Sequence, residues 1–363
     1  MVDARPTSAI RGVMAPGLEA GEYSGPNTDL MQFVQSTWES DYRGKVTFPL
    51  WSADYFDWQF HQDLGANRRL CVRDAGALVG VLMGSPCRFR LGAAVLHGAH
   101  YSWLSVARSH RGRGLATTLD ATRMQHEQQH AGDVIVSFRF TGSRHSLAER
   151  PDRQSPKFQR PIGLWARPLS GSGLRRWNTS RAEGWLAWAG TPLTRSIRFP
   201  ESSACLRPYQ HLDLGQCLNI VTARNDRFAF TVDWDETLLQ HQLGGSPVGQ
   251  TLVWERQGVV RGFINFHVLP FCGRTVEPVA IIDMIEIDQL TPRDQSEFLR
   301  RCLQVMQQQG AIVALKLRCG DVSSRTMLLN GFTPRLRDSH LVLQTTAAPI
   351  RLPSRKPVRL LWR

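Results

Sequence analysis

A basic, glycine-bearing turn between an apolar run and a helix-like segment is the stretch of this sequence whose residues point most directly to chemistry. The run Trp103-Leu104-Ser105-Val106 leads into Arg111-Gly112-Arg113-Gly114, and a helix-like pattern begins at Leu115 and Ala116. Glycines let a backbone approach a ligand closely. N–H groups at a helix start bind anions, and arginines add charge for phosphates. The stretch therefore predicts a phosphate-binding loop, with an ordinary turn as the alternative.

This loop lacks G-x-G-x-x-G, and no Gly-Lys-Ser/Thr follows it, so it matches neither the Rossmann fingerprint nor a P-loop. It does match R-x-x-G-x-A at Arg111, Gly114 and Ala116. That pattern resembles the pyrophosphate loop of the GNAT superfamily of acyl-CoA-dependent acyltransferases. The resemblance implies that CoA binds a set of residues around the loop, namely Val106, Arg111, Gly112, Arg113, Gly114, Leu115, Ala116 and Thr141.

The elements that must position this loop follow the GNAT order. A helix at 28–39, a hairpin at 69–83, a long strand at 94–106, the loop with its helix, and a strand at 133–140 succeed one another. The same order returns in the second half, but the corresponding turn, Asp288 to Pro292, carries an acid and no glycine. We therefore expect an α/β fold with mixed sheets, in two tandem GNAT-like domains related by pseudo-two-fold symmetry, of which only the first binds CoA.

The domain boundaries follow from this order and from composition. We expect a flexible N-terminus and a CoA-binding domain, then a linker, a degenerate domain that binds the acceptor, and a tail. Their ranges are 1–27, 28–175, 176–200, 201–346 and 347–363.

Longer segments resemble N-myristoyltransferase, whose tandem GNAT halves bind CoA only through the first. The likeness extends roughly over 28–363 and is carried by Phe48–Trp58, Ala77–Pro86, Ser102–Ala116, Trp165–Leu169, Leu206–Pro208 and Phe263–Pro270. It implies that the N–H groups of Trp103 and Leu104 form an oxyanion hole. It also implies that the terminal carboxylate, on Arg363, is the general base. A frayed basic tail is the alternative, and His100 is a further candidate for proton relay.

The sequence departs from that family where the family binds its peptide. The family's acidic run becomes Glu39 to Lys45, and Lys316 replaces an acidic residue. An N-terminal-glycine peptide and a myristoyl donor therefore do not follow. Asp283 and Glu286 remain candidates for holding an acceptor amine, with a structural role as the alternative.

Composition narrows the classes of partner. The net charge of +13 and the pI near 10.1 suit an acidic acceptor or an acidic acyl carrier protein. The chain carries no recognisable nucleic-acid module, so we expect no specific nucleic-acid partner. Its seven scattered cysteines favour a reduced, cytoplasmic setting, and no apolar run is long enough for a transmembrane segment.

His126-Glu127-Gln128-Gln129-His130 matches the zincin motif H-E-x-x-H. Gly132 ends the helix at once and no third ligand is signalled, so we expect no catalytic metal.

Taken with the GNAT-like loop and the resemblance to N-myristoyltransferase, the sequence predicts an N-acyltransferase. It would move an acyl group from acyl-CoA, or from acyl carrier protein, to a primary amine of a peptide or small molecule. The alternatives are an acetyl-CoA-dependent N-acetyltransferase and a non-catalytic CoA-binding protein.

Overall fold

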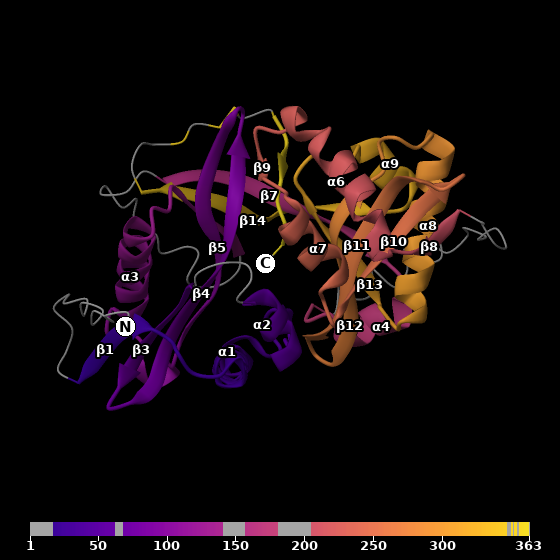
Figure 1. Ribbon diagram of the computed structural model, residues 1–363. Helices are drawn as coiled ribbons and strands as arrows, with labels where there is room; N and C mark the ends of the chain where they lie inside the picture. The colour runs from indigo at the N-terminus through magenta and orange to yellow at the C-terminus, as the bar shows by residue number, and fades with distance from the viewer. Residues whose placement is uncertain are drawn as a thin grey trace.

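A computed structural model describes residues 17–61, 68–140, 157–180, 205–346, 350, 352–353 and 356–362. Within these residues, one mixed sheet of fifteen strands runs through both halves of the chain (Figure 1). Along its main path the strand order is β1-β3-β4-β5-β6-β14-β7-β13-β12-β11-β10-β8. Neighbours far apart in sequence, such as β6 and β14, show that the halves are not separate sheets.

The first half is built on the long hairpin of β4 (Ala77–Leu91) and β5 (Ala94–Val106). α3 follows β5 and packs against β3, β4 and β5, while α1 and α2 also belong to this half. The remaining bounds are α1 Asn27–Tyr42, β2 Phe48–Pro49, α2 Ala53–Gln59, β3 Arg68–Asp74, α3 Leu115–Gln129 and β6 Val134–Phe140.

The N-terminal region differs from the expectation of a flexible segment over 1–27. Leu18–Glu22 forms strand β1, which pairs antiparallel with β3 along its whole length. Leu18 is buried in the cluster around Leu70 and Leu119. Because Leu18 can reach this core only as part of an edge strand, the segment is ordered by packing that its Gly-rich composition does not reveal.

The second half repeats the arrangement around the hairpin of β11 (Val259–Cys272) and β12 (Val276–Glu286). The expected helix at 291–309 is confirmed as α8 (Pro292–Gln308), and the Thr291 side chain caps it by accepting from the N–H of Asp294. The other bounds are β8 Leu206–Pro208, α6 Leu214–Thr222, β9 Phe230–Val232, α7 Glu236–Gly244, β10 Gly249–Arg256, β13 Val313–Arg318, α9 Ser324–Leu329, β14 Thr333–Thr345 and β15 Val358–Arg359.

The two halves exchange strands at their junction. β7 (Lys157–Pro168) pairs antiparallel with β13, and β14 lies between β6 and β7. The sequence analysis places loops between 142 and 196, but 157–168 is a central strand and Gly171–Trp177 is helix α4. The predicted boundary near residue 175 therefore divides the chain but not the sheet.

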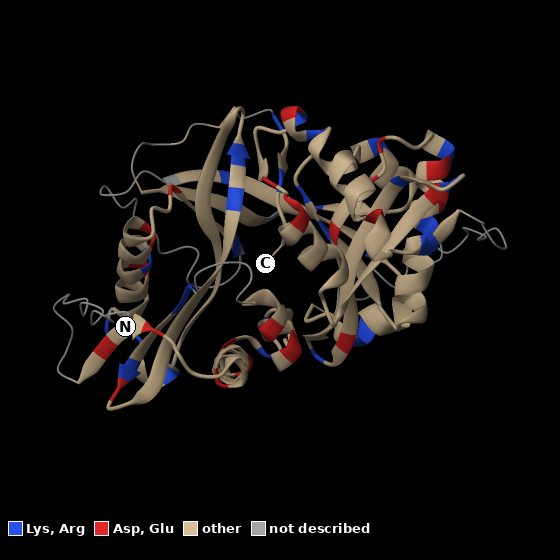
Figure 2. Cartoon of the chain, viewed as in Figure 1, with Lys and Arg blue, Asp and Glu red and all other residues tan. Residues whose placement is uncertain are grey.

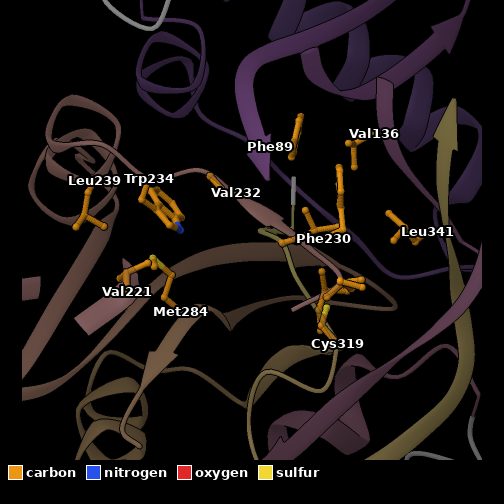
Figure 3. Close-up of a cluster of buried hydrophobic side chains, with 14 of the residues drawn as sticks. Phe89, Val136, Val221, Phe230, Val232, Trp234, Leu239, Met284, Cys319 and Leu341 are labelled. Carbon is orange, nitrogen blue, oxygen red and sulfur yellow. The ribbon is translucent and has the colours of Figure 1, made fainter. Parts of the chain in front are cut away.

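The largest apolar cluster draws on both halves (Figure 3). Phe89 of β4 stacks on Phe230 of β9 with ring centroids 5.1 Å apart, and Val136 of β6 lies in the same cluster as Leu341 of β14. Burying aromatic rings and β-branched side chains across this junction holds the halves together as one unit.

Basic and acidic residues are interspersed over both halves (Figure 2), so the positive net charge is not confined to one element. Among the helices that the structure describes, none is both long and apolar enough to cross a membrane.

Candidate active site

A β-bulge distorts β5 just before its end. Ser102 pairs with Met83 and Ser105 pairs with Val81, so Trp103 and Leu104 together face one residue of β4. Trp103 has φ +59°, an uncommon angle for a residue with a side chain. A bulge leaves its extra residue out of the regular ladder, so the pairing of β5 with β4 is interrupted at Trp103 and Leu104.

An aromatic cluster fixes the bulge. The Trp103 ring lies 6.0 Å from that of Trp51, 5.5 Å from Phe56 and 5.5 Å from Phe60, measured between centroids. Trp103 is 4% exposed, whereas Leu104 is 47% exposed. A strained φ persists only where surrounding packing determines it, and this cluster supplies that packing on one side while the other side stays open.

β5 and β6 separate just before the bulge. Their parallel pairing covers only Gly98–Tyr101 against Val134–Ser137, although β5 continues to Val106 and β6 to Phe140. The bulge at Trp103 and Leu104 therefore lies where the two strands part, and β6 does not pair with the backbone of β5 there.

The glycine-bearing loop begins α3 with backbone that only glycine adopts readily. Gly112 has φ +76°, and Gly114, the N-cap of α3, has φ +79°. A Cβ added at either position would meet no described atom within 4 Å. Among the described residues, no side chain caps the first N–H groups of α3. The loop therefore leaves the N-terminal end of the 15-residue helix α3, which carries the positive end of the helix dipole, open to a ligand.

The two arginines of the loop are held by acids. Arg111 donates two hydrogen bonds to the Asp41 carboxylate, one of them 2.7 Å long, and also donates to the Val106 carbonyl. Nη1 of Arg113 lies 3.4 Å from Oδ2 of Asp74. The same oxygen lies 2.9 Å from Nε2 of His110. The His110 and Arg113 side chains lower the pKa of Asp74. Arg111 thus fixes the loop to α1 through Asp41.

Asp41 is a residue that sequence reasoning missed. It lies in the stretch where the sequence departs from the N-myristoyltransferase pattern, 70 positions before its partner Arg111. Its side chain is only 12% exposed. Nothing in the local spacing signals this contact, because it depends on how α1 packs against β5.

An apolar cavity of about 50 Å³ lies between the halves. It is lined from the first half by Trp58, Phe89 and His100, and from the second by Val232 and by His241 of α7. His100 is 7% exposed, and its ring centroid lies 5.2 Å from that of Phe138. The predicted relay histidine is therefore at a cavity wall, three residues before the bulge.

The C-terminal tail also lines this cavity. β15 pairs parallel with β9, and Leu360 and Leu361 then contribute to the cavity wall. Trp362 packs against apolar clusters of both halves, and the chain end lies in the middle of the molecule (Figure 1). Residues 358–362 of the tail are therefore docked against the rest of the protein. Arg363 and Thr141 lie outside the described residues.

Acidic residues of the second half have partners of their own. Glu286 accepts hydrogen bonds from Arg224 at 2.7 Å and Arg359 at 3.3 Å. Asp283 lies 3.0 Å from His267 and accepts from Gln242 at 3.2 Å. Both carboxylates are buried. The arrangement favours the structural alternative for these acids over direct binding of an amine.

Glu127 of the H-E-x-x-H motif is fully buried. Arg68 donates to it at 2.6 Å and the Tyr101 hydroxyl at 2.8 Å. Burial raises the pKa of Glu127, but His126 and Arg68 outweigh this effect, and the pKa lies below its ordinary value. A carboxylate held in this way cannot serve as general base for a metal-bound water, so the zinc-hydrolase interpretation has no support.

Comparison with known proteins agrees with this geometry. Residues 30–136 match the Acetyltransferase (GNAT) family. No curated protein sequence has a significant match to the chain.

Solved structures extend the similarity over the whole chain. Saccharomyces cerevisiae N-myristoyltransferase with bound myristoyl-CoA is similar with a TM-score of 0.74 at 14% identity, over 98% of this chain and 87% of that one. A second structure of that enzyme gives 0.73 at 14% identity, over 100% and 92%. A GCN5-related N-acetyltransferase from Anabaena variabilis gives 0.54 at 12% identity, over 90% and 72%. The predicted tandem GNAT-like fold and the resemblance to N-myristoyltransferase are confirmed.

Proposed function

We propose that this tandem GNAT-fold chain, similar along its length to N-myristoyltransferase, transfers an acyl group from acyl-CoA to a primary amine. The observation that carries the proposal is the bulge at Trp103 and Leu104, set where β5 and β6 part and followed by the uncapped, glycine-lined start of α3. A thioester needs an anion site for its nucleotide and donors for its carbonyl, and this segment supplies both within a few residues.

CoA would lie with its pyrophosphate against the N–H groups of Gly112 to Leu115. Gly112 and Gly114 leave open space there, and the helix dipole favours the negative charge. Val106, Arg111, Arg113 and Ala116 complete the cofactor-binding residues that the sequence predicts within the described chain. Arg111 would act by holding the loop in place through Asp41.

Transfer would proceed by direct attack. The amine nitrogen bonds to the thioester carbonyl carbon, and the N–H groups of Trp103 and Leu104 stabilise the oxyanion of the tetrahedral intermediate. The carbon–sulfur bond then breaks and CoA leaves as the thiolate. The proton of the amine passes to the terminal carboxylate of Arg363, which follows the docked Trp362 directly.

The cavity between the halves would receive the acyl group or the apolar part of the acceptor. Its walls are mostly apolar side chains, among them Trp58, Phe89 and Leu360. Myristoyl-CoA is bound in the yeast enzyme's structures, and that similarity favours a long acyl chain, with acetyl as the shorter alternative. A cavity of about 50 Å³ holds only a short part of an acyl group, so a long chain would extend beyond it.

The test is release of free thiol from acyl-CoA. Purified protein is incubated with acetyl-, octanoyl- and myristoyl-CoA, each with and without a panel of primary amines, and the products are identified by mass spectrometry. We expect amine-dependent thiol release and an acylated amine with one of these donors. Acyl carrier protein loaded with a myristoyl group is included as a second type of donor. Binding of CoA without turnover on any amine would instead support the non-catalytic alternative.

A further inference from the structure

We propose that Glu22, His126 and His130 form a binding site for a zinc-type divalent metal ion, separate from the acyl-transfer site. Glu22 ends β1, and both histidines lie at the C-terminal end of α3, the opposite end from Gly114. Each side chain offers one ligand atom, and these atoms all lie within 4.8 Å of one another. The two histidines of the H-E-x-x-H motif would thus bind a metal ion, although its glutamate, Glu127, cannot act as a hydrolytic base.

The hydrogen bonds of His130 fix which of its nitrogens is available. Its Nδ1 lies 2.8 Å from the backbone carbonyl oxygen of His126. A carbonyl oxygen only accepts, so Nδ1 must carry the proton, and in a neutral ring Nε2 then keeps its lone pair. A backbone carbonyl behind the ring is the usual support for a metal-binding histidine.

His126 is placed in the same manner. Its Nδ1 faces the buried Glu127 carboxylate at 3.8 Å, and its Nε2 faces the Glu22 carboxylate at 3.2 Å. His126 is 3% exposed, and the Glu22 carboxylate is the partner of its Nε2. A metal ion between these two atoms would be bound by both of them, with His130 as the third ligand.

The distance between two of the donors is close to that expected around tetrahedral zinc, and the third lies within 4.8 Å of both. Two ligand atoms at about 2.0–2.1 Å from a tetrahedral zinc ion lie about 3.3 Å apart, close to the 3.2 Å between His126 Nε2 and Glu22 Oε1. The two imidazoles, one helical turn apart, stack at 4.1 Å between centroids. Imidazole with one carboxylate suits zinc, copper or nickel better than calcium or magnesium. A water molecule would take the fourth position.

Such an ion would have a structural role, because it would cross-link two elements of the first half. It would join β1, at the sheet edge, to α3, the helix whose other end carries the phosphate loop. Glu127 would orient His126 while remaining bound to Arg68 and Tyr101, so the ion would stabilise the fold and perform no hydrolysis.

The test uses the full-length protein after removal of metals with a chelator. Zn²⁺ is titrated calorimetrically into wild type, Glu22→Gln, His130→Asn and the control Glu19→Gln. Glu19 is an exposed acid on the same strand, and its substitution removes the same charge. We expect one Zn²⁺ per chain for wild type and Glu19→Gln, at least tenfold weaker binding for both site variants, and a Zn²⁺-dependent rise in Tm only where binding is tight.

Co²⁺ substitution gives a second readout, since cobalt bound by four nitrogen and oxygen ligands absorbs visible light without the strong charge-transfer band that cysteine ligands produce. Binding unaffected by Glu22→Gln and His130→Asn, or absent at stoichiometric Zn²⁺ in a folded wild type, would overturn the proposal. In that case the His126–Glu22 contact is a simple ion pair.

Discussion

Arg359 places its Nη1 3.3 Å from Oε1 of Glu286, and this contact joins the last strand of the chain to β12 of the second half. Arg359 also donates to Asn225 at 2.6 Å and to Thr231 at 3.0 Å. Both members of the ion pair are buried. The tail is therefore fixed at β15, four residues before Arg363, whose carboxylate we propose as the general base.

Replacing Arg359 with methionine should destabilise the protein strongly. The change leaves the Glu286 carboxylate buried beside Arg224 alone, and breaking a buried ion pair costs roughly 3–5 kcal/mol. The control is Arg227→Met, because Arg227 forms an ion pair with Asp288 but is 64% exposed, and such pairs contribute about 1 kcal/mol or less. Urea unfolding measures both; equal losses would show that Glu286 does not anchor the tail.

The terminal carboxylate can be separated from the arginine side chain. Deleting Arg363 moves the carboxylate back by one residue, whereas Arg363→Ala keeps it in place. If the carboxylate accepts the amine proton, deletion should lower kcat by roughly 10²–10⁴-fold and Arg363→Ala should leave kcat within a few-fold. Initial rates of thiol release decide this. Similar rates for the deletion and wild type would remove the carboxylate from the mechanism.

One of the two backbone N–H groups proposed to stabilise the oxyanion can be removed by itself. Replacing Leu104 by its α-hydroxy acid turns the amide into an ester and removes only that donor. Loss of one oxyanion donor costs about 10²–10³-fold in kcat, and KM should change little. The same replacement at Leu96, earlier on β5 and paired with Phe89, controls for a lost ladder bond. An unchanged kcat for the Leu104 ester would contradict the assignment.

Cysteine reactivity tests whether transfer is direct. Burial raises the pKa of Cys217 and of Cys319 to about 12, and raises the pKa of Cys302 as well, so these thiols are poor nucleophiles near neutral pH. In the native protein, a thiol reagent should label Cys87 and Cys205, which are partly exposed, and spare the five buried thiols. Mass spectrometry of labelled peptides checks this.

Cys87 lines the central cavity, and Cys205 does not. A bound acyl donor should therefore slow labelling of Cys87 and leave the rate at Cys205 unchanged. Protection of neither thiol would mean that the cavity does not hold the acyl group. An acyl thioester trapped on a buried cysteine would replace direct attack by a two-step transfer.

Local patterns in the sequence predicted much of this structure. The glycine-bearing turn before α3, the strand over 94–106 and the capped helix after Thr291 all depend on neighbouring residues, and each is found where expected. The positive φ of Gly112 and Gly114 follows from the same local chemistry.

What the sequence did not reveal depends on packing between distant segments. The Asp41–Arg111 contact spans 70 positions, and β14 enters between β6 and β7 because apolar side chains of both halves share one cluster. Glu22, the third residue of the proposed metal site, was missed for the same reason, since β1 lies beside α3 only in the folded sheet.

The claim on which the account depends is that the loop at Gly114 binds CoA. Gly114 and Gly92 both have positive φ and open space around a hypothetical Cβ, but Gly92 lies at the far end of β5, in the β4–β5 turn. Leucine at either position should cost a similar amount of stability, about 1–2 kcal/mol. Only at Gly114 would the added side chain occupy the proposed phosphate site.

Calorimetric titration of wild type, Gly114→Leu and Gly92→Leu with CoA is the most direct test of this claim. The account predicts that wild type and Gly92→Leu bind one CoA with similar Kd, while Gly114→Leu binds at least tenfold more weakly. Wild type that releases no heat with CoA or acyl-CoA, or a Gly114→Leu variant that binds as tightly as wild type, would contradict it.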